Sequence, residues 1–168
     1  MLELKDYLKK LEDSLVYKGW KADNKDSFLY IFFRIMGGND NNEDEGWEIG
    51  FFDRKKDSST SFIVNSEVKI SAEDSKIFKH KDEDVNDLDI DKVKIGPEQA
   101  LSIIEKIRND KYKNEVPSKK IVILQKIDVI LWNITYITNN FNTLNFKIDA
   151  ISGDVIEDTL KPALSFRE

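Results

Sequence analysis

Histidine, cysteine and carboxylate side chains are the groups that could give this chain catalytic activity or a metal site. The single histidine, His80, lies in the charged stretch KIFKHKDED, and the chain has no cysteine. A zinc site needs several convergent ligands, and triad chemistry needs a base placed beside its nucleophile. One histidine without cysteine argues against a zinc enzyme, and it excludes a cysteine nucleophile and a disulfide. We therefore expect His80 to be solvated.

The acidic run that begins at Asp82 is the densest group of potential cation ligands. Its start, Asp82-x-Asp84-x-Asn86, has the spacing of the first ligands in a helix-loop-helix calcium loop. The sixth position is Asp87, where that loop needs glycine, and the twelfth is Val93, where it needs glutamate. The sequence therefore predicts a solvated acidic segment and no metal site.

No arrangement of residues marks the chain as an enzyme. Carboxylates do acid–base work when burial or a neighbouring charge shifts the pKa of one of them. Nearly all acids here lie in polar runs or at outward strand positions. Gly37–Gly38 lacks the following Lys-Ser or Lys-Thr of a phosphate-binding loop. We predict a protein without catalytic residues and without a cofactor.

The net charge of −6 at pH 7 is unevenly distributed. Segments 39–45 and 73–92 together carry −8, from twelve acids against four bases, so the rest of the chain is nearly balanced. Nucleic-acid binding needs a basic face, and a membrane-spanning helix needs roughly 18 apolar residues. The sequence has neither, so we expect no nucleic-acid and no membrane partner. Because the start, MLELKDYLKKLEDSL, is charged throughout, unlike a signal peptide, we expect a cytoplasmic location.

The first half of the chain reads as one helix followed by strands. Leucines recur at the spacing of one helix face, at Leu4, Leu8, Leu11 and Leu15, and Gly19 is placed to end that helix. Aromatic and β-branched residues favour strands at Phe28–Met36 and at Trp47–Arg54. The stretch SFIVNSEVKIS indicates a further strand, bent at Asn65–Ser66.

The second half repeats that order. Gly96–Pro97 opens a helix, because proline suits the first helical turn and Glu98 suits the positive end of the helix dipole. We expect strands at 119–127, 128–138 and 143–150, with the turn NNFN between the last two. Apolar and polar residues alternate through LNFKIDA, which predicts that one face of the last of these strands is buried.

These patterns predict an α+β fold of two helix-then-antiparallel-strand units, with the helices packed on one face of the antiparallel sheet. We place the first unit at residues 1–71, an acidic linker at 72–92 and the second unit at 93–168. The patterns leave open whether the two units form one joint domain.

The second unit resembles the PepSY domain family over roughly Val93 to Leu160. Three pieces carry the resemblance: an alanine early in the helix, Trp-x-Ile on a strand, and the hairpin Asp-Ala-x-x-Gly-x-Val. The residues in these places are Ala100, Trp132, Ile134, Asp149, Ala150, Gly153 and Val155. The resemblance implies a non-catalytic binding or inhibitory module, of the kind found in propeptides of thermolysin-type metallopeptidases. It carries no catalytic residue over to this chain.

Aromatic residues crowd the first half and give the candidate binding surface. Phe28–Phe33 is apolar on both faces, which indicates either a strand covered on both sides or a face reserved for a partner. Aromatic side chains are enriched at protein interfaces. The candidate binding residues are Tyr30, Phe32, Trp47 and Phe52. Acidic loops would tune charge complementarity with a partner through Asp40, Glu43, Asp44, Asp82, Glu83 and Asp84.

The predicted function is a non-catalytic, regulatory protein-binding module, in its sharpest form a peptidase inhibitor. One alternative is an acidic immunity or antitoxin protein that neutralises a basic toxin, because acidic loops speed such an association. Another is a small-molecule carrier with an apolar pocket between helix and sheet. The sequence identifies neither the protein partner nor the oligomeric state.

Overall fold

The computed structural model describes residues 3–37, 46–77 and 83–163. The helical elements in these ranges are α1 (Leu4–Asp13), α2 (Leu15–Asp23), the 3₁₀ turn η1 (Ile90–Lys92) and α3 (Pro97–Lys111). The strands are β1 (Phe28–Gly37), β2 (Trp47–Asp53), β3 (Ser58–Val64), β4 (Val68–Ser75), β5 (Pro117–Lys126), β6 (Ile130–Thr138), β7 (Asn142–Asp149) and β8 (Val155–Pro162).

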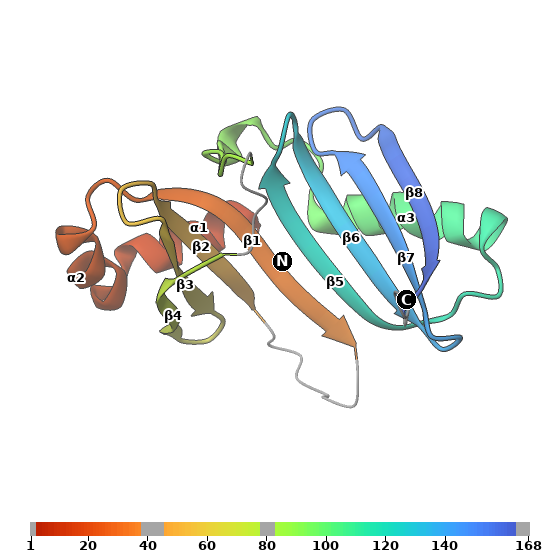
Figure 1. Ribbon diagram of the computed structural model, residues 1–168, viewed down its shortest axis with the longest axis horizontal. Coiled ribbons are helices and arrows are strands. Elements are labelled where there is room, and N and C mark those ends of the chain that lie inside the picture. Colours follow the sequence, from red (N-terminus) through yellow and green to blue (C-terminus); the bar gives the residue numbers. More distant parts are fainter. Residues whose placement is uncertain (1–2, 38–45, 78–82, 164–168) are drawn as a thin grey trace.

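All eight strands of the described ranges form one antiparallel sheet, in the order β4-β3-β2-β1-β5-β6-β7-β8 (Figure 1). The prediction of an α+β fold made of two helix-then-antiparallel-strand units is wrong, because this single sheet dominates the structure. β1 and β5 pair at its centre, from Ile31 opposite Gln125 to Gly37 opposite Lys119. Without that pairing both strands would be sheet edges with unpaired backbone groups.

The helices α1, α2 and α3 lie on one face of the sheet, behind it in Figure 1. Apolar side chains from this face and from the helices form the core, in which aromatic rings contact one another across strands. Trp47 lies 6.1 Å from Phe32 and 6.2 Å from Trp132 between ring centroids. No described helix covers the opposite face, which we call the open face. None of the described helices is long and apolar enough to cross a membrane.

Residues 72–92, expected to be an acidic linker, contribute to the sheet and to the core. Strand β4 continues to Ser75, so the first part of this segment is hydrogen-bonded to β3. Leu88 and Ile90 are buried, and the Leu88 backbone N–H donates to the Leu29 carbonyl oxygen at 2.9 Å. Apolar residues within the acidic sequence therefore tie this segment to the sheet.

Two predicted elements are each divided in the structure. The leucine-striped helix ends at Asp13, because Ser14 is extended and its hydroxyl oxygen accepts from the Tyr17 N–H at 3.1 Å, which starts α2. Gly19 therefore lies inside α2. The strand expected through 61–71 is instead the hairpin of β3 and β4, since the Asn65 side chain accepts from the Glu67 N–H at 3.0 Å in the turn.

The hairpin between β7 and β8 is held by a side chain and permitted by a glycine. The Asp149 carboxylate accepts from the backbone N–H groups of Ile151 and Ser152, and these hydrogen bonds, led by the one from Ser152, hold the pKa of Asp149 below its usual value. Gly153 has a φ of 82°, where a side chain would be strained. A Cβ at Gly153 would also lie 3.3 Å from the Ile95 side chain, so the turn packs closely on the segment before α3.

The buried indole of Trp132 makes a hydrogen bond whose contribution to stability can be tested. Its Nε1–H donates to the Ile95 carbonyl oxygen at 2.8 Å, whereas the buried Nε1 of Trp20 has no hydrogen-bond partner among the described residues. Trp132→Phe should lower the free energy of unfolding by about 1–2 kcal/mol more than Trp20→Phe, because only the first change leaves the partly buried Ile95 carbonyl without its donor. Urea unfolding of the two variants measures the difference. Equal losses would contradict a stabilising role for this hydrogen bond.

Candidate functional site

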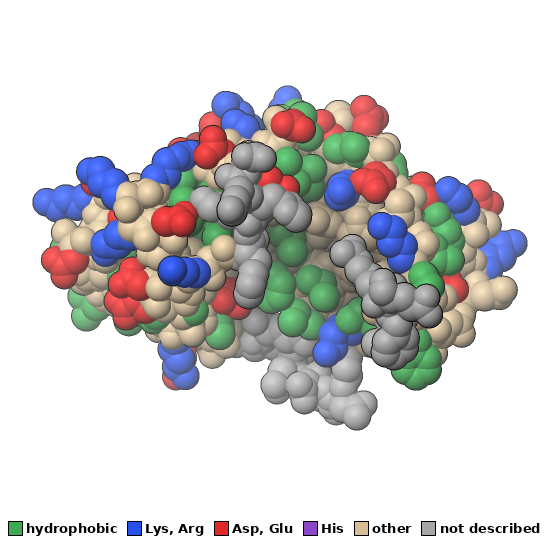
Figure 2. All heavy atoms as spheres, in the orientation of Figure 1, with side chains coloured by type: hydrophobic (Ala, Val, Ile, Leu, Met, Phe, Trp, Pro, Cys, Tyr) green, Lys and Arg blue, Asp and Glu red, His purple; other side chains and the backbone are tan. Residues whose placement is uncertain are grey.

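The open face carries an apolar strip along the two central strands. Ile31, Phe33 and Ile35 of β1 and Ile121 and Ile123 of β5 point to this face, opposite to the buried residues that alternate with them. Cross-strand pairing places Phe33 beside Ile123 and Ile35 beside Ile121. Figure 2 shows hydrophobic side chains gathered near the centre of this face. These five residues are the apolar strip.

The structure divides the four aromatic candidates between the two faces of the sheet. Phe32 and Trp47 are buried against the helices, so they are core residues and cannot touch a partner in this structure. Tyr30 and Phe52 lie on the open side, with ring centroids 6.0 Å apart. Phe52 is nevertheless buried, because neighbouring rings cover it. Of the four, Tyr30 is the residue that combines an open-face position with partial exposure.

A β-bulge in β1 separates Tyr30 from Phe32, whereas Trp47 and Phe52 lie on opposite faces by the ordinary alternation of β2. The register of β1 against β2 shifts between Leu29 and Ile31, so Tyr30 and Ile31 both lie on the open side while strict alternation would separate them. Gly50 makes room for the bulge. A Cβ at Gly50 would lie 2.6 Å from Ile31 Cγ2 and 2.9 Å from Tyr30 Cε1, both closer than van der Waals contact allows.

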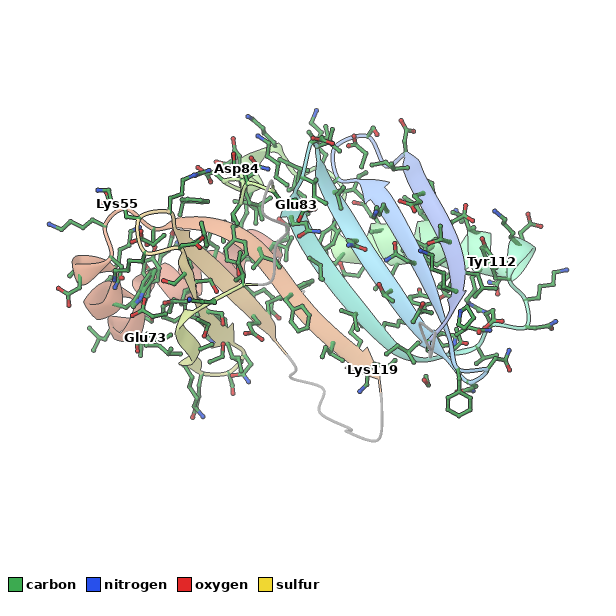
Figure 3. All side chains as sticks on the ribbon, viewed as in Figure 1. Lys55, Glu73, Glu83, Asp84, Tyr112 and Lys119 are labelled. Atoms are coloured by element: carbon green, nitrogen blue, oxygen red, sulfur yellow. The ribbon has the colours of Figure 1, made fainter. Side chains whose placement is uncertain are left out.

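A cavity of about 720 Å³ adjoins the apolar strip beside this bulge. Tyr30 and Ile31 line it from the sheet, and Glu83 to Asn86 line it from the segment before η1. The end of β5 and the turn after it add Lys126, Ile127 and Asp128, and Ile77, which follows β4, also lines the cavity. Figure 3 shows Glu83 and Asp84 near the end of β5. The cavity therefore combines an apolar base with carboxylates.

Three hydrogen bonds fix the segment that carries these carboxylates. Arg54 Nη2 donates to the Val85 carbonyl oxygen at 2.8 Å, and its guanidinium lies 4.6 Å from the centroid of the Phe28 ring. The Asn86 side chain donates to the Ile127 carbonyl oxygen at 3.0 Å. The bond from Leu88 to Leu29 holds the next turn of chain. The cavity wall is thus attached to β1, to the turn after β2 and to the turn after β5.

The structure brings together Tyr30, Glu83 and Asp84 from the predicted site. Asp40, Glu43, Asp44, Asp82 and His80 lie outside the described residues. The Tyr30 phenol is protonated at neutral pH, as an ordinary tyrosine is, and burial raises its pKa further, so it can donate a hydrogen bond and offer an aromatic face. This set of groups suits binding of an apolar and cationic surface.

Sequence reasoning missed the contribution of β5 to the strip. KKIVILQK is apolar at consecutive positions, and a strand apolar on both faces is the signal that was recognised in β1.

A polar cluster on the open face was also missed, because its members come from three strands. The Glu48 carboxylate accepts from Ser61 at 2.8 Å and from Ser71 at 2.9 Å. Only the pairing of β2, β3 and β4 places these side chains together.

Comparison with known proteins adds a structural neighbour. No protein-family model matches the chain, and no curated protein matches its sequence. The fold is similar to the crystal structure of a protein from Clostridium difficile 630 described as a “putative lipoprotein”. The TM-score is 0.56 at 18% sequence identity, and the match covers 95% of this chain and 93% of that chain. At this identity the similarity shows the fold alone, and the PepSY resemblance stays a prediction.

The attachment of residues 83–88 to the sheet can be tested at Arg54. Arg54→Met removes the hydrogen bond to Val85 and the contact with Phe28, so backbone amides in 83–88 should exchange with solvent faster, on the order of tenfold. Lys55→Met is the matched control, because the neighbouring Lys55 pairs with exposed Asp26. Hydrogen exchange followed by mass spectrometry measures both variants. Unchanged exchange in Arg54→Met would contradict this attachment.

Proposed function

We propose that the protein is a non-catalytic, regulatory protein-binding module whose working surface is the open face of the sheet. The proposal rests on the apolar strip, which lies on the side of the sheet that no described helix covers, beside a cavity lined by carboxylates. An antiparallel sheet with one solvated face normally presents polar residues there. Here the two central strands present isoleucine and phenylalanine.

The chemistry of the surface favours a partner segment with apolar side chains next to lysine or arginine. Ile35 is 41% exposed at one end of the strip. At the other end, Glu83, Asp84 and Asp128 line the cavity, with Lys126 as the cation among its described residues. Charge complementarity of this kind sets orientation and association rate, and apolar contacts at the centre supply affinity. The net charge of −6 favours a basic partner in the same way.

Peptidase inhibition and neutralisation of a basic toxin are two forms of this proposal, and they differ in the identity of the partner. A panel of metallopeptidases tests the first, and a neighbouring toxin gene would support the second. The acidic cavity supports a basic partner in either form. A small-molecule carrier stays the alternative outside protein binding, with the cavity at Tyr30 as its site. A cytoplasmic location is part of the proposal, and cell fractionation checks it.

Substitution of one strip residue tests the surface. Ile35→Lys places a charge on the exposed end of the strip and should weaken partner binding about thirtyfold, the effect of losing a hot spot of about 2 kcal/mol. Leu15→Lys is the matched control, since Leu15 is an apolar residue 87% exposed on α2, on the helix side of the sheet. Tagged wild type and both variants are incubated with native lysate, and the dissociation constant of the retained protein is measured by calorimetry. A retained protein that binds Ile35→Lys as tightly as wild type would refute the proposal, as would the retention of no protein.

The acidic cavity makes a separate prediction about salt. The double change Asp84→Asn, Asp128→Asn should weaken binding of the same retained protein on the order of tenfold at low salt, and should reduce the salt dependence of its affinity. Asp13→Asn, Asp23→Asn removes the same total charge from the helices and serves as the control. If both pairs have equal effects, net charge rather than the cavity governs the association.

A further inference from the structure

The turn between β6 and β7 presents an exposed aromatic side chain. Phe141 is 75% exposed. Among the exposed large hydrophobic residues of the described ranges, it is the only aromatic one. The neighbouring turn before β5 exposes Val116, at 51%. The Asn139 N–H donates to the Val116 carbonyl oxygen at 2.9 Å, so the two turns are joined. Two apolar side chains therefore project from adjacent turns at one end of the sheet.

The backbone at Phe141 is unfavourable for this residue type. Its φ is 59°, in the left-handed region, and the other described residues besides glycine with positive φ are Asp57 and Asp74. Aspartate and asparagine tolerate this region, whereas a bulky residue there is strained. The residues on either side of Phe141 are asparagines, which would fit the conformation at less cost. Folding alone does not account for a phenylalanine at this position.

A buried carboxylate holds the turn in a fixed conformation. Glu115 is buried, and its carboxylate accepts from the Thr138 hydroxyl at 2.6 Å and from the Asn142 side chain at 3.1 Å. The Asn140 side chain donates to the Asn114 carbonyl oxygen at 2.9 Å. The hydrogen bond from Thr138, followed by those from the two asparagines, keeps the pKa of Glu115 below its usual value, so the carboxylate is ionised at neutral pH. These bonds lie at both ends of the turn and leave Phe141 as its projecting residue.

A rigid turn reduces the entropy that a contact loses on binding. We propose that Phe141 is an anchor that inserts into an apolar pocket of the protein partner docked on the open face, with Val116 at the rim of that contact. This inference rests on the proposed function. The C-terminal end of β1 and the β6–β7 turn lie at the same end of the sheet (Figure 1), so a partner lying along the strip reaches the turn. Polar asparagines around one aromatic ring suit a protein pocket with a polar edge rather than a lipid surface.

The test compares Phe141→Ala and Phe141→Asn with Ile156→Ala, which shortens another exposed apolar residue, on the edge strand β8. The probe is the protein that tagged wild-type chain retains from native lysate, and its dissociation constant is measured for each variant. Both changes at Phe141 should weaken binding about thirtyfold, and Ile156→Ala should leave it within about twofold. Phe141→Asn should also raise Tm, because asparagine tolerates positive φ.

The other outcomes distinguish failure of the anchor at Phe141 from failure of the proposed function. Full binding by Phe141→Ala, while Ile35→Lys loses binding, would overturn the anchor and leave the proposed function in place. Full binding by both would overturn both. A lower Tm for Phe141→Asn would mean that the ring is structural, and would overturn the anchor. Sedimentation of wild type, but not of Phe141→Ala, with phosphatidylcholine–phosphatidylglycerol vesicles would assign the side chain to a membrane instead.

Discussion

β1 and β5 pair along the middle of the sheet, and the position of almost every other part follows from their register. This pairing sends Phe32 and Leu124 toward the helices and Phe33 and Ile123 toward the open face. The same ladder joins the strands on either side into one surface, with β4 and β8 as its edges. A register shifted by one residue would exchange the two faces, burying the apolar strip and exposing core residues. The core and the candidate binding surface are therefore set by one interaction.

The bulge at Tyr30 places two neighbouring side chains of β1 in the lining of the cavity. It turns Tyr30 and Ile31 toward the same side, and Gly50 on β2 provides the space they need. The segment that carries Glu83 and Asp84 is then held above these residues by Arg54 and Asn86. The apolar strip and the acidic cavity are consequently neighbours, although their residues come from parts of the chain that are far apart in sequence.

Local sequence signals predicted the local parts of this structure. The start of α3 at Gly96–Pro97, the strand character of Phe28–Met36 and the turn at Gly153 depend on neighbouring residues, and the structure confirms them. The register between β1 and β5 joins segments about 90 residues apart, and no local pattern encodes it. For this reason the fold was predicted as two units. The bulge was not predicted either. Strict alternation places Tyr30 and Phe32 on the same face of β1, whereas the bulge puts them on opposite faces.

Site-specific photo-crosslinking can show whether the open face contacts a protein partner. A benzophenone amino acid is placed at position 35 in one form of the full chain and at position 15 in another, and each form is irradiated in its native host. If the open face is the binding surface, position 35 at the exposed end of the strip should give one defined protein adduct, and position 15 on α2 should give none. An adduct from position 15 with none from position 35 would contradict this proposal, as would the absence of an adduct from both.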